Sequence, residues 1–231
     1  MISQGCIFFG AFANRLYLKT LPYLSKQNIP RIPDFDVLST NPKKTADILK
    51  QRLSDFGIKD IKIKKQDGIG EVIAQHYEVF VGEETVVFIY EPLACHSYNR
   101  VEIDKKFINI ATLDTMLSFY LAFLYVERSY YKANRILCMS EYLFRVQQKN
   151  RLTKRGINNR FSINCYGKQH TIEKMRSEKS ERYKELKNKK KSKEYEWYFL
   201  RYVPFEENKK TTTKKKKTTT KKKKATSKKK K

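Results

Sequence analysis

The amino-acid sequence predicts an α+β protein: a mixed sheet with helices, followed by a mainly helical region and a Lys-rich tail. Three observations support this fold class. Runs of β-branched and aromatic residues alternate with helical spacing before residue 100, and apolar spacing becomes helical after it. From residue 209 the chain holds only Lys, Thr, Ala and Ser, which predicts disorder. We therefore expect three regions, 1–100, 101–204 and 205–231.

The first elements are a strand and a helix joined at a glycine. Residues 6–9 (CIFF) form a short apolar run, which predicts a buried strand. This run leads into Gly10 and Ala11, and helical spacing follows over residues 13–21. Three prolines then predict a loop, because proline removes a backbone donor and fixes φ; they are Pro22, Pro30 and Pro33.

The next elements are a second strand and a well-marked helix. Residues 34–38 alternate between polar and apolar side chains, which predicts a strand. Asn41 can cap a helix and Pro42 suits its first turn. The apolar spacing predicts a helix over 43–56, and Gly57 ends it.

Three further strands complete the first region. Residues 58–65 alternate in part, which predicts a strand. Two apolar runs, 72–81 and 85–90, are separated by the short loop 82–84, which predicts a hairpin. The order of elements in this region is therefore strand, helix, strand, helix and then strands.

The second region is predicted to be helical. Residues 108–127 are apolar on nearly all sides, as in a helix buried in a core. Residues 130–150 predict a second helix, and residues 172–202 predict a long charged one. The longest apolar stretch, 113–126, contains an acid and is shorter than the roughly 20 residues that a spanning helix needs.

The charge balance predicts a polyanionic partner. The chain has 50 Lys and Arg against 24 Asp and Glu, a net charge of +26. The segment 209–231 holds 14 Lys and no acid, which leaves +12 on the rest. Nucleic acid is the commonest partner of such a chain, and no membrane partner is expected.

The cysteines suggest neither a metal site nor a disulfide framework. All four are widely spaced and no CxxC pair occurs; they are Cys6, Cys95, Cys138 and Cys165. We therefore expect a reducing compartment. The histidines have no partners at metal-ligand spacing.

The sharpest chemical signal is the pair Asp34 and Asp36 around Phe35. Alternation along a strand places both carboxylates on one face. Such a pair can hold Mg²⁺ or Mn²⁺, and two metal ions can clamp the attacking and leaving oxygens of a phosphoryl transfer. The alternative is a pair that occurs by chance on an exposed strand.

The context favours the metal site. Gly10 and Ala11 stand between a strand and a helix, and backbone N–H groups at such a helix start can bind a triphosphate. A strand, a glycine-led helix and then two acids on the next strand is the layout of the nucleotidyltransferase fold shared with DNA polymerase β.

The chain also resembles a more particular family, the poly(A) polymerase catalytic subunits of large cytoplasmic DNA viruses, of the mimivirus and African swine fever virus type. The resemblance covers most of residues 1–204. It rests on segments 7–13 (IFFGAFA), 33–39 (PDFDVLS), 91–98 (EPLACHSY), 110–117 (IATLDTML) and 161–167 (FSINCYG).

The resemblance implies a function and a set of site residues. It implies transfer of AMP from ATP to RNA 3′ ends, in viral mRNA polyadenylation. Asp34 and Asp36 would be catalytic and would hold the metal, and Gly10 and Ala11 would contact the nucleotide. Region 1–100 would be the catalytic domain. The implied location is the virion or the host cytoplasm, in a viral factory.

One departure from the family pattern leaves two hypotheses open. A third carboxylate is expected on the second strand of the hairpin, and the best register places Phe88 there. The nearest acids are Glu84 and Glu91. Either the protein is an active polymerase, or it is a degenerate member that acts as an RNA-binding or dimerisation partner of an active copy.

Basic and aromatic residues are mixed between positions 151 and 168. This mixture suits a single-stranded RNA backbone with stacked bases. A solvated basic face is the alternative. The predicted RNA-binding residues are Arg151, Lys154, Arg155, Arg160 and Lys168, with Phe161 and Tyr166 beside them.

Overall fold

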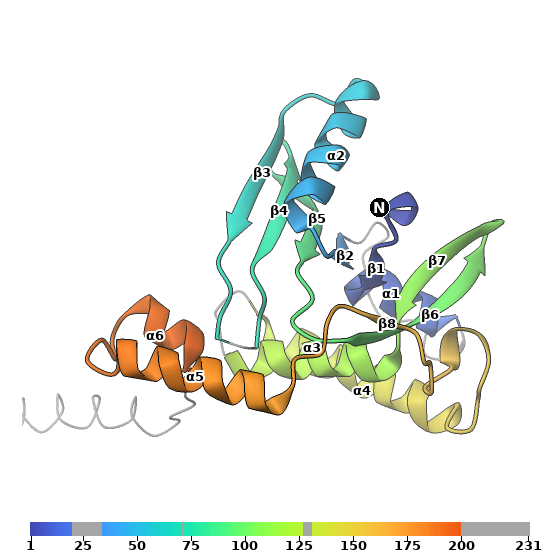
Figure 1. Cartoon of the computed structure of the whole chain (residues 1–231). Helices are drawn as coiled ribbons and strands as arrows, with labels where there is room; N and C mark the ends of the chain where they lie inside the picture. Colours follow the sequence, from blue (N-terminus) through green and yellow to red (C-terminus); the bar gives the residue numbers. More distant parts are fainter. Residues whose placement is uncertain (20–33, 71, 127–130, 200–231) are drawn as a thin grey trace, which may run out of the picture. The chain divides into compact units, whose positions relative to one another are not determined.

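We describe the fold from a computed structural model, in residues 1–19, 34–70, 72–126 and 131–199 (Figure 1). The predicted proline-containing loop lies outside these residues, as does the predicted disordered tail, 205–231. No helix in the described part of the chain is long and apolar enough to span a membrane.

The described residues form a mixed sheet of eight strands, in the order β3-β4-β5-β2-β1-β7-β6-β8. The central strands β2 and β1 are antiparallel, and each pairs on its other side with a parallel strand, β5 or β7. The strands are β1 (Ile7–Phe9), β2 (Phe35–Leu38), β3 (Ile61–Gln66), β4 (His76–Val81), β5 (Glu84–Tyr90), β6 (His96–Ile103), β7 (Lys106–Ala111) and β8 (Cys165–Tyr166).

Helices cover the sheet and extend the chain beyond it. They are α1 (Gly10–Leu18), α2 (Pro42–Asp55), α3 (Leu113–Val126), α4 (Ala133–Lys149), α5 (Ile172–Leu186) and α6 (Lys193–Tyr198). Helix α2 packs against β3, β4 and β5, and α3 packs against α4. The predicted α+β class with a helical C-terminal part is therefore confirmed.

Strands β1 and β2, in the middle of the sheet, form part of the hydrophobic core. Ile7, Phe9, Val37 and Leu38 are fully buried. The ring of Phe9 stacks on Phe119 of α3, with 4.6 Å between the ring centroids. This contact fixes α3 over the face of the sheet that Phe9 presents.

Helix α2 begins where its sequence signals predicted. Asn41 is the N-cap of α2, and its side chain accepts a hydrogen bond from the backbone N–H of Lys44 at 3.1 Å. Pro42 is the first helical residue. The prediction of this helix is confirmed because cap, proline and apolar spacing all act locally.

The predicted helix over 108–127 is wrong in its first part. Residues Lys106–Ala111 form β7, which pairs with β6 and with β1, and α3 begins only at Leu113. Ile108 and Ile110 are buried and Asn109 is half-buried. This alternation covers only a few residues and runs directly into the apolar residues of α3, so the sequence pattern alone does not separate the strand from the helix that follows. The predicted boundary at residue 100 falls inside β6.

Smaller differences occur at three other elements. Helix α1 begins at Gly10, ahead of its predicted start. Strand β4 begins at His76, after a bridge between Ile69 and Ile73. The predicted helix over 172–202 is divided into α5 and α6 within the described residues.

The expectation that the cysteines do not pair is wrong for two of them. A disulfide joins Cys95 and Cys165, which are 70 residues apart in the sequence. The antiparallel pairing of β6 with β8 brings them together, since Ser97 lies opposite Cys165. Spacing along the chain carries no information about a contact that the sheet creates.

Candidate functional site

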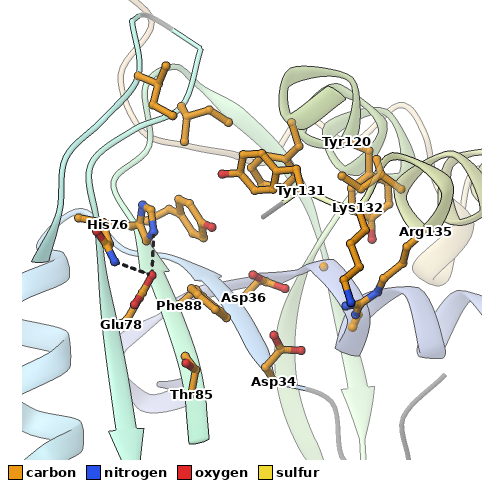
Figure 2. A pocket seen from close by; sticks show the side chains of 18 of the residues that line it. Asp34, Asp36, His76, Glu78, Thr85, Phe88, Tyr120, Tyr131, Lys132 and Arg135 are labelled. Atoms are coloured by element: carbon orange, nitrogen blue, oxygen red, sulfur yellow. Dashed lines mark hydrogen bonds and ion pairs between the residues drawn. The ribbon is translucent and has the colours of Figure 1, made fainter. Parts of the chain in front are cut away.

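The residues predicted to form the site lie in one pocket of about 570 Å³. Asp36 is on β2 and Asp34 directly precedes it, while Gly10 and Ala11 begin α1. Strand β1 pairs with β2 in the register Phe9 opposite Asp36, which places the start of α1 beside the carboxylates. Figure 2 shows the side chains of Asp34 and Asp36 on the same side of the sheet.

Gly10 is required by the position of Asp36. Its φ is +62°, in the left-handed region, and a Cβ at this position would overlap the Asp36 carboxylate. The backbone N–H of Ala11 donates a hydrogen bond to that carboxylate. The group that approaches Gly10 most closely in this structure is therefore a carboxylate of the site itself.

The Asp36 carboxyl group has an unusual proton affinity. Burial, together with the nearby charge of Asp34, raises the pKa of Asp36 to about 8. The Ala11 N–H and the Arg135 guanidinium lower it in part. Without a cation, Asp36 is mostly protonated at neutral pH. A divalent metal ion would favour the charged form, and two adjacent carboxylates with oxygen donors fit Mg²⁺ or Mn²⁺.

The predicted position of the third carboxylate holds an aromatic residue. Strands β2 and β5 are parallel and place Phe88 opposite Asp36, so the predicted register is confirmed. Within the described residues, no group of three or more His, Cys, Asp or Glu side chains is placed to hold a metal ion. Beside the aspartate pair the pocket therefore presents a phenyl ring at the position where the resemblance implies a third acid. Its other two acids, Asp67 and Glu78, line the pocket but do not form a three-acid group with the pair.

The nearest acid on the far side of Phe88 is Glu78, on β4. Figure 2 shows the Phe88 side chain between Glu78 and Asp36. The Glu78 carboxylate accepts a hydrogen bond from Gln66 Nε2 at 3.1 Å and lies 3.6 Å from His76 Nε2. These contacts direct Glu78 away from the aspartate pair.

The other two acids considered from the sequence, Glu84 and Glu91, lie outside the pocket lining. Glu84 is exposed at the start of β5. Glu91 follows β5, and its Oε2 accepts a hydrogen bond from Gln75 Nε2 at 2.9 Å. Neither Glu84 nor Glu91 is among the residues that line the pocket.

Two cations stand opposite the aspartates, and the sequence did not single them out. Lys132 and Arg135, at the start of α4, line the pocket. Figure 2 shows both side chains extending from the α4 side toward Asp34 and Asp36. They belong to a helix far along the chain, so no local pattern links them to the carboxylates.

A buried hydroxyl group faces the same region. Tyr120 of α3 lines the pocket and is 2% exposed. Burial, and then the charge of Asp36, raise the pKa of Tyr120, which keeps its hydroxyl protonated. Among the residues that the structure describes, this hydroxyl has no hydrogen-bond partner. It is therefore a donor available to a ligand.

The other end of the pocket is aromatic and apolar. The His76 ring stacks on Tyr90 with 4.5 Å between centroids, and Tyr131 stacks on Phe123 at 4.6 Å. Ile69 and Ile73 add apolar side chains to the lining. The pocket therefore has a charged end, suited to metal and phosphate, and an end with stacked rings, suited to a planar ring. The polar side chains of Gln66 and Glu78 lie beside His76 at that end.

The residues predicted to bind RNA lie outside the pocket. Arg151, Lys154, Arg155 and Lys168 are exposed. Arg151 follows the last turn of α4, and the helix rise of about 1.5 Å per residue puts it on the order of 20 Å from Arg135.

Arg160 differs from the other predicted RNA-binding residues. Its guanidinium donates two hydrogen bonds to the Asp114 carboxylate, at 3.0 and 3.2 Å. Gln147 donates to the same carboxylate at 2.7 Å. Arg160 is therefore engaged within the chain, where it ties its segment to the start of α3.

Comparison with known proteins shows a likeness in structure. No family model and no curated protein sequence matches this chain. The crystal structure of the Megavirus polyadenylate synthase is similar, with a TM-score of 0.58 at 14% sequence identity. The match covers 80% of this chain and 39% of the Megavirus chain, so this chain spans well under half of that protein's length. At this identity the likeness concerns the fold, and the chain has a nucleotidyltransferase-like α+β fold.

Proposed function

We propose that this protein is a polynucleotide adenylyltransferase-like protein that binds a nucleoside triphosphate with a divalent metal ion, but transfers AMP poorly. In this proposal it acts as an RNA-binding or dimerisation partner of an active poly(A) polymerase. The observation that carries the proposal is Phe88 opposite Asp36, where an active site of this kind needs a third acid.

The binding half of the proposal rests on the lining of the pocket. Asp34 and Asp36 would hold Mg²⁺ or Mn²⁺, which when bound neutralises phosphate charge. Lys132, Arg135 and the Tyr120 hydroxyl supply donors for the phosphates of ATP. The aromatic end of the pocket suits the adenine ring.

The catalytic half of the proposal rests on proton transfer. The attacking 3′ hydroxyl of RNA has to lose a proton, and a carboxylate beside the metal favours that loss. The phenyl ring of Phe88 accepts no proton and binds no metal. General base catalysis contributes about 10²- to 10⁴-fold to rate, so a deficit of that order is expected.

The second candidate is an active enzyme that adds AMP from ATP to RNA 3′ ends. Two observations favour it: the aspartate pair is retained, and the cations Lys132 and Arg135 stand opposite. Under either candidate, a location in the virion or a viral factory remains part of the proposal.

Two measurements on the purified protein test these candidates. The first is ATP binding by calorimetry with Mg²⁺, for the wild type and for the D34A/D36A and K132A/R135A variants. The second is extension of an RNA primer. Arg145→Ala is the matched control, since Arg145 is an exposed cation of the same helix that pairs with Glu141.

We expect the wild type and R145A to bind ATP, and both double variants to bind at least tenfold more weakly. We expect primer extension by the wild type no faster than by D34A/D36A. Extension by the wild type that D34A/D36A abolishes would establish the active enzyme instead. Failure of the wild type to bind ATP would refute both candidates.

A further inference from the structure

The chain segment 157–167, here called the strap, lies along the edge of β6. Asn99 of β6 is buried, and its Nδ2 donates hydrogen bonds to the carbonyls of Ile157 at 3.0 Å and Asn159 at 2.7 Å. The Ser162 hydroxyl donates to the carbonyl of Tyr98 at 2.6 Å, and the Tyr98 N–H donates to the carbonyl of Asn164 at 3.2 Å.

The far end of the strap reaches the strand that carries the aspartates. The Tyr166 hydroxyl accepts a hydrogen bond from the backbone N–H of Thr40, just beyond β2, at 3.0 Å. Gly167 has φ +103°, and a Cβ there would overlap the carbonyl oxygen of Ala94. The strap is therefore closely fitted to the chain on both sides of Cys95.

A disulfide closes this arrangement. It joins Cys95, just before β6, to Cys165 in the strap, with 5.4 Å between the Cα atoms. The covalent loop between them encloses β6, β7, α3 and α4. Cys165 is exposed and Cys95 is half-buried, so a small thiol in solution can reach the bond.

We propose that Cys95 and Cys165 form a reversible redox fastening that holds the strap on the sheet. Oxidation removes two protons and two electrons from the two thiols and forms the S–S bond. A small-molecule disulfide such as oxidised glutathione takes up both and becomes two thiols. Reduction by thiol–disulfide exchange reverses these steps through a mixed disulfide.

The contacts of the strap explain why the fastening is reversible. In the reduced state the hydrogen bonds at Asn99, Tyr98 and Thr40 still hold the two thiols close together. In the oxidised state the bond adds a covalent restraint to the unfolded chain, and the gain grows with the length of the closed loop. The fastening uses no residue that lines the pocket, so it is independent of the proposed nucleotide binding.

The test compares the full-length protein after incubation with oxidised glutathione and after incubation with a thiol reductant. Intact mass after alkylation counts the thiols, and peptide mapping identifies them. Calorimetry measures the unfolding temperature. Hydrogen exchange measures protection of residues 157–167. The variants are C95S/C165S and, as a matched control with an exposed cysteine outside the disulfide, C138S.

We expect Cys95 and Cys165 to resist alkylation only after oxidation. We expect reduction to lower the unfolding temperature by on the order of 10 °C in the wild type and in C138S, and to reduce protection of the strap. C95S/C165S should show no redox response. Alkylation of both cysteines after oxidation would overturn the proposal, and so would equal strap protection in the two states. ATP binding, measured in parallel, reports separately on the proposed function.

Discussion

At the scale of single residues, the site is decided by which side chain each strand presents on one face of the sheet. Asp36 and Phe88 lie opposite each other on β2 and β5, and Glu78 follows on β4. Two of these three positions hold acids, but the phenyl ring lies between them. In the proposed function, the residue at position 88 therefore decides whether the pocket only binds ATP or also transfers AMP.

Phe88→Asp is expected to create activity. The new carboxylate would lie opposite Asp36 on the adjacent strand, where it can share a metal ion and accept the proton of the RNA 3′ hydroxyl. We expect Mg²⁺-dependent primer extension at least 10²-fold faster than that of the wild type. Phe88→Asn is the matched control, because it has the same size without the charge. Equal rates for the two variants, with ATP binding intact, would contradict this account of the site.

Asp36→Asn is expected to change how stability depends on pH. The folded protein holds the Asp36 proton up to a pKa of about 8, whereas the unfolded chain releases it near 3.8. Over that window the folded state binds more protons, so wild-type stability falls as the pH rises and this contribution is lost above pH 8. Without metal, the stability of D36N relative to wild type should rise from pH 5 to pH 8 and then level off.

Urea unfolding of both proteins at a series of pH values measures this difference. Saturating Mg²⁺ should flatten the pH dependence of the wild type, because the metal favours the charged carboxylate. D36N, which lacks the titrating group, should respond less. A stability difference that stays constant from pH 5 to pH 9 would show that Asp36 does not retain its proton in the folded protein.

At the scale of elements, α4 has a separate group of cations near each of its two ends. Its start brings Lys132 and Arg135 to the pocket, and its end leads to the exposed cations Arg151, Lys154 and Arg155. An RNA strand whose 3′ end occupies the pocket could reach the second group only by following the molecule for on the order of 20 Å. Variants of the two groups can therefore be tested separately.

The triple variant R151Q/K154Q/R155Q is expected to weaken RNA binding through fewer phosphate contacts. Each lost contact to a single strand reduces the slope of log K against log salt by about 0.7, so the triple variant should lose about 2. Fluorescence anisotropy at several salt concentrations measures the slope. K43Q/K44Q/K50Q, three exposed lysines on α2, is the matched control. Equal slopes for the two variants would show that the predicted segment is a solvated basic face.

At the scale of the whole molecule, the net charge of +26 has two sources. The segment 209–231 contributes 14 Lys, and it lies outside the described residues. The remaining +12 lies on a chain whose pocket combines acids, cations and aromatic rings. The lysines of segment 209–231 favour binding to any polyanion. The remaining +12 belongs to the part of the chain that forms the pocket.

Deletion of residues 209–231 is expected to lower non-specific RNA affinity steeply at low salt and little at high salt, because counterion release drives binding by lysine runs. ATP binding should not change, since the described residues that line the pocket all lie between Gly10 and Met139. Anisotropy with RNA and calorimetry with ATP measure the two effects. An unchanged salt slope would show that the segment does not contact RNA.

Local signals in the sequence predicted much of the central site. Alternation placed Asp34 and Asp36 on one face, and the glycine between strand and helix marked the start of α1. The best register of the hairpin against the resembled family placed Phe88 at the position of the third carboxylate, and the structure pairs it with Asp36. The first two features depend on residues a few positions apart. The third depends on strand register, which period-two patterns constrain.

Only the tertiary structure decided the rest, because it depends on contacts between distant parts of the chain. The packing of α3 and α4 brings Tyr120, Lys132 and Arg135 to the aspartates, and no spacing in the sequence records this. The pairing of β6 with β8 joins Cys95 to Cys165 for the same reason. The sequence by itself determined the aspartate pair and the residue that faces it, whereas the fold determined what surrounds them.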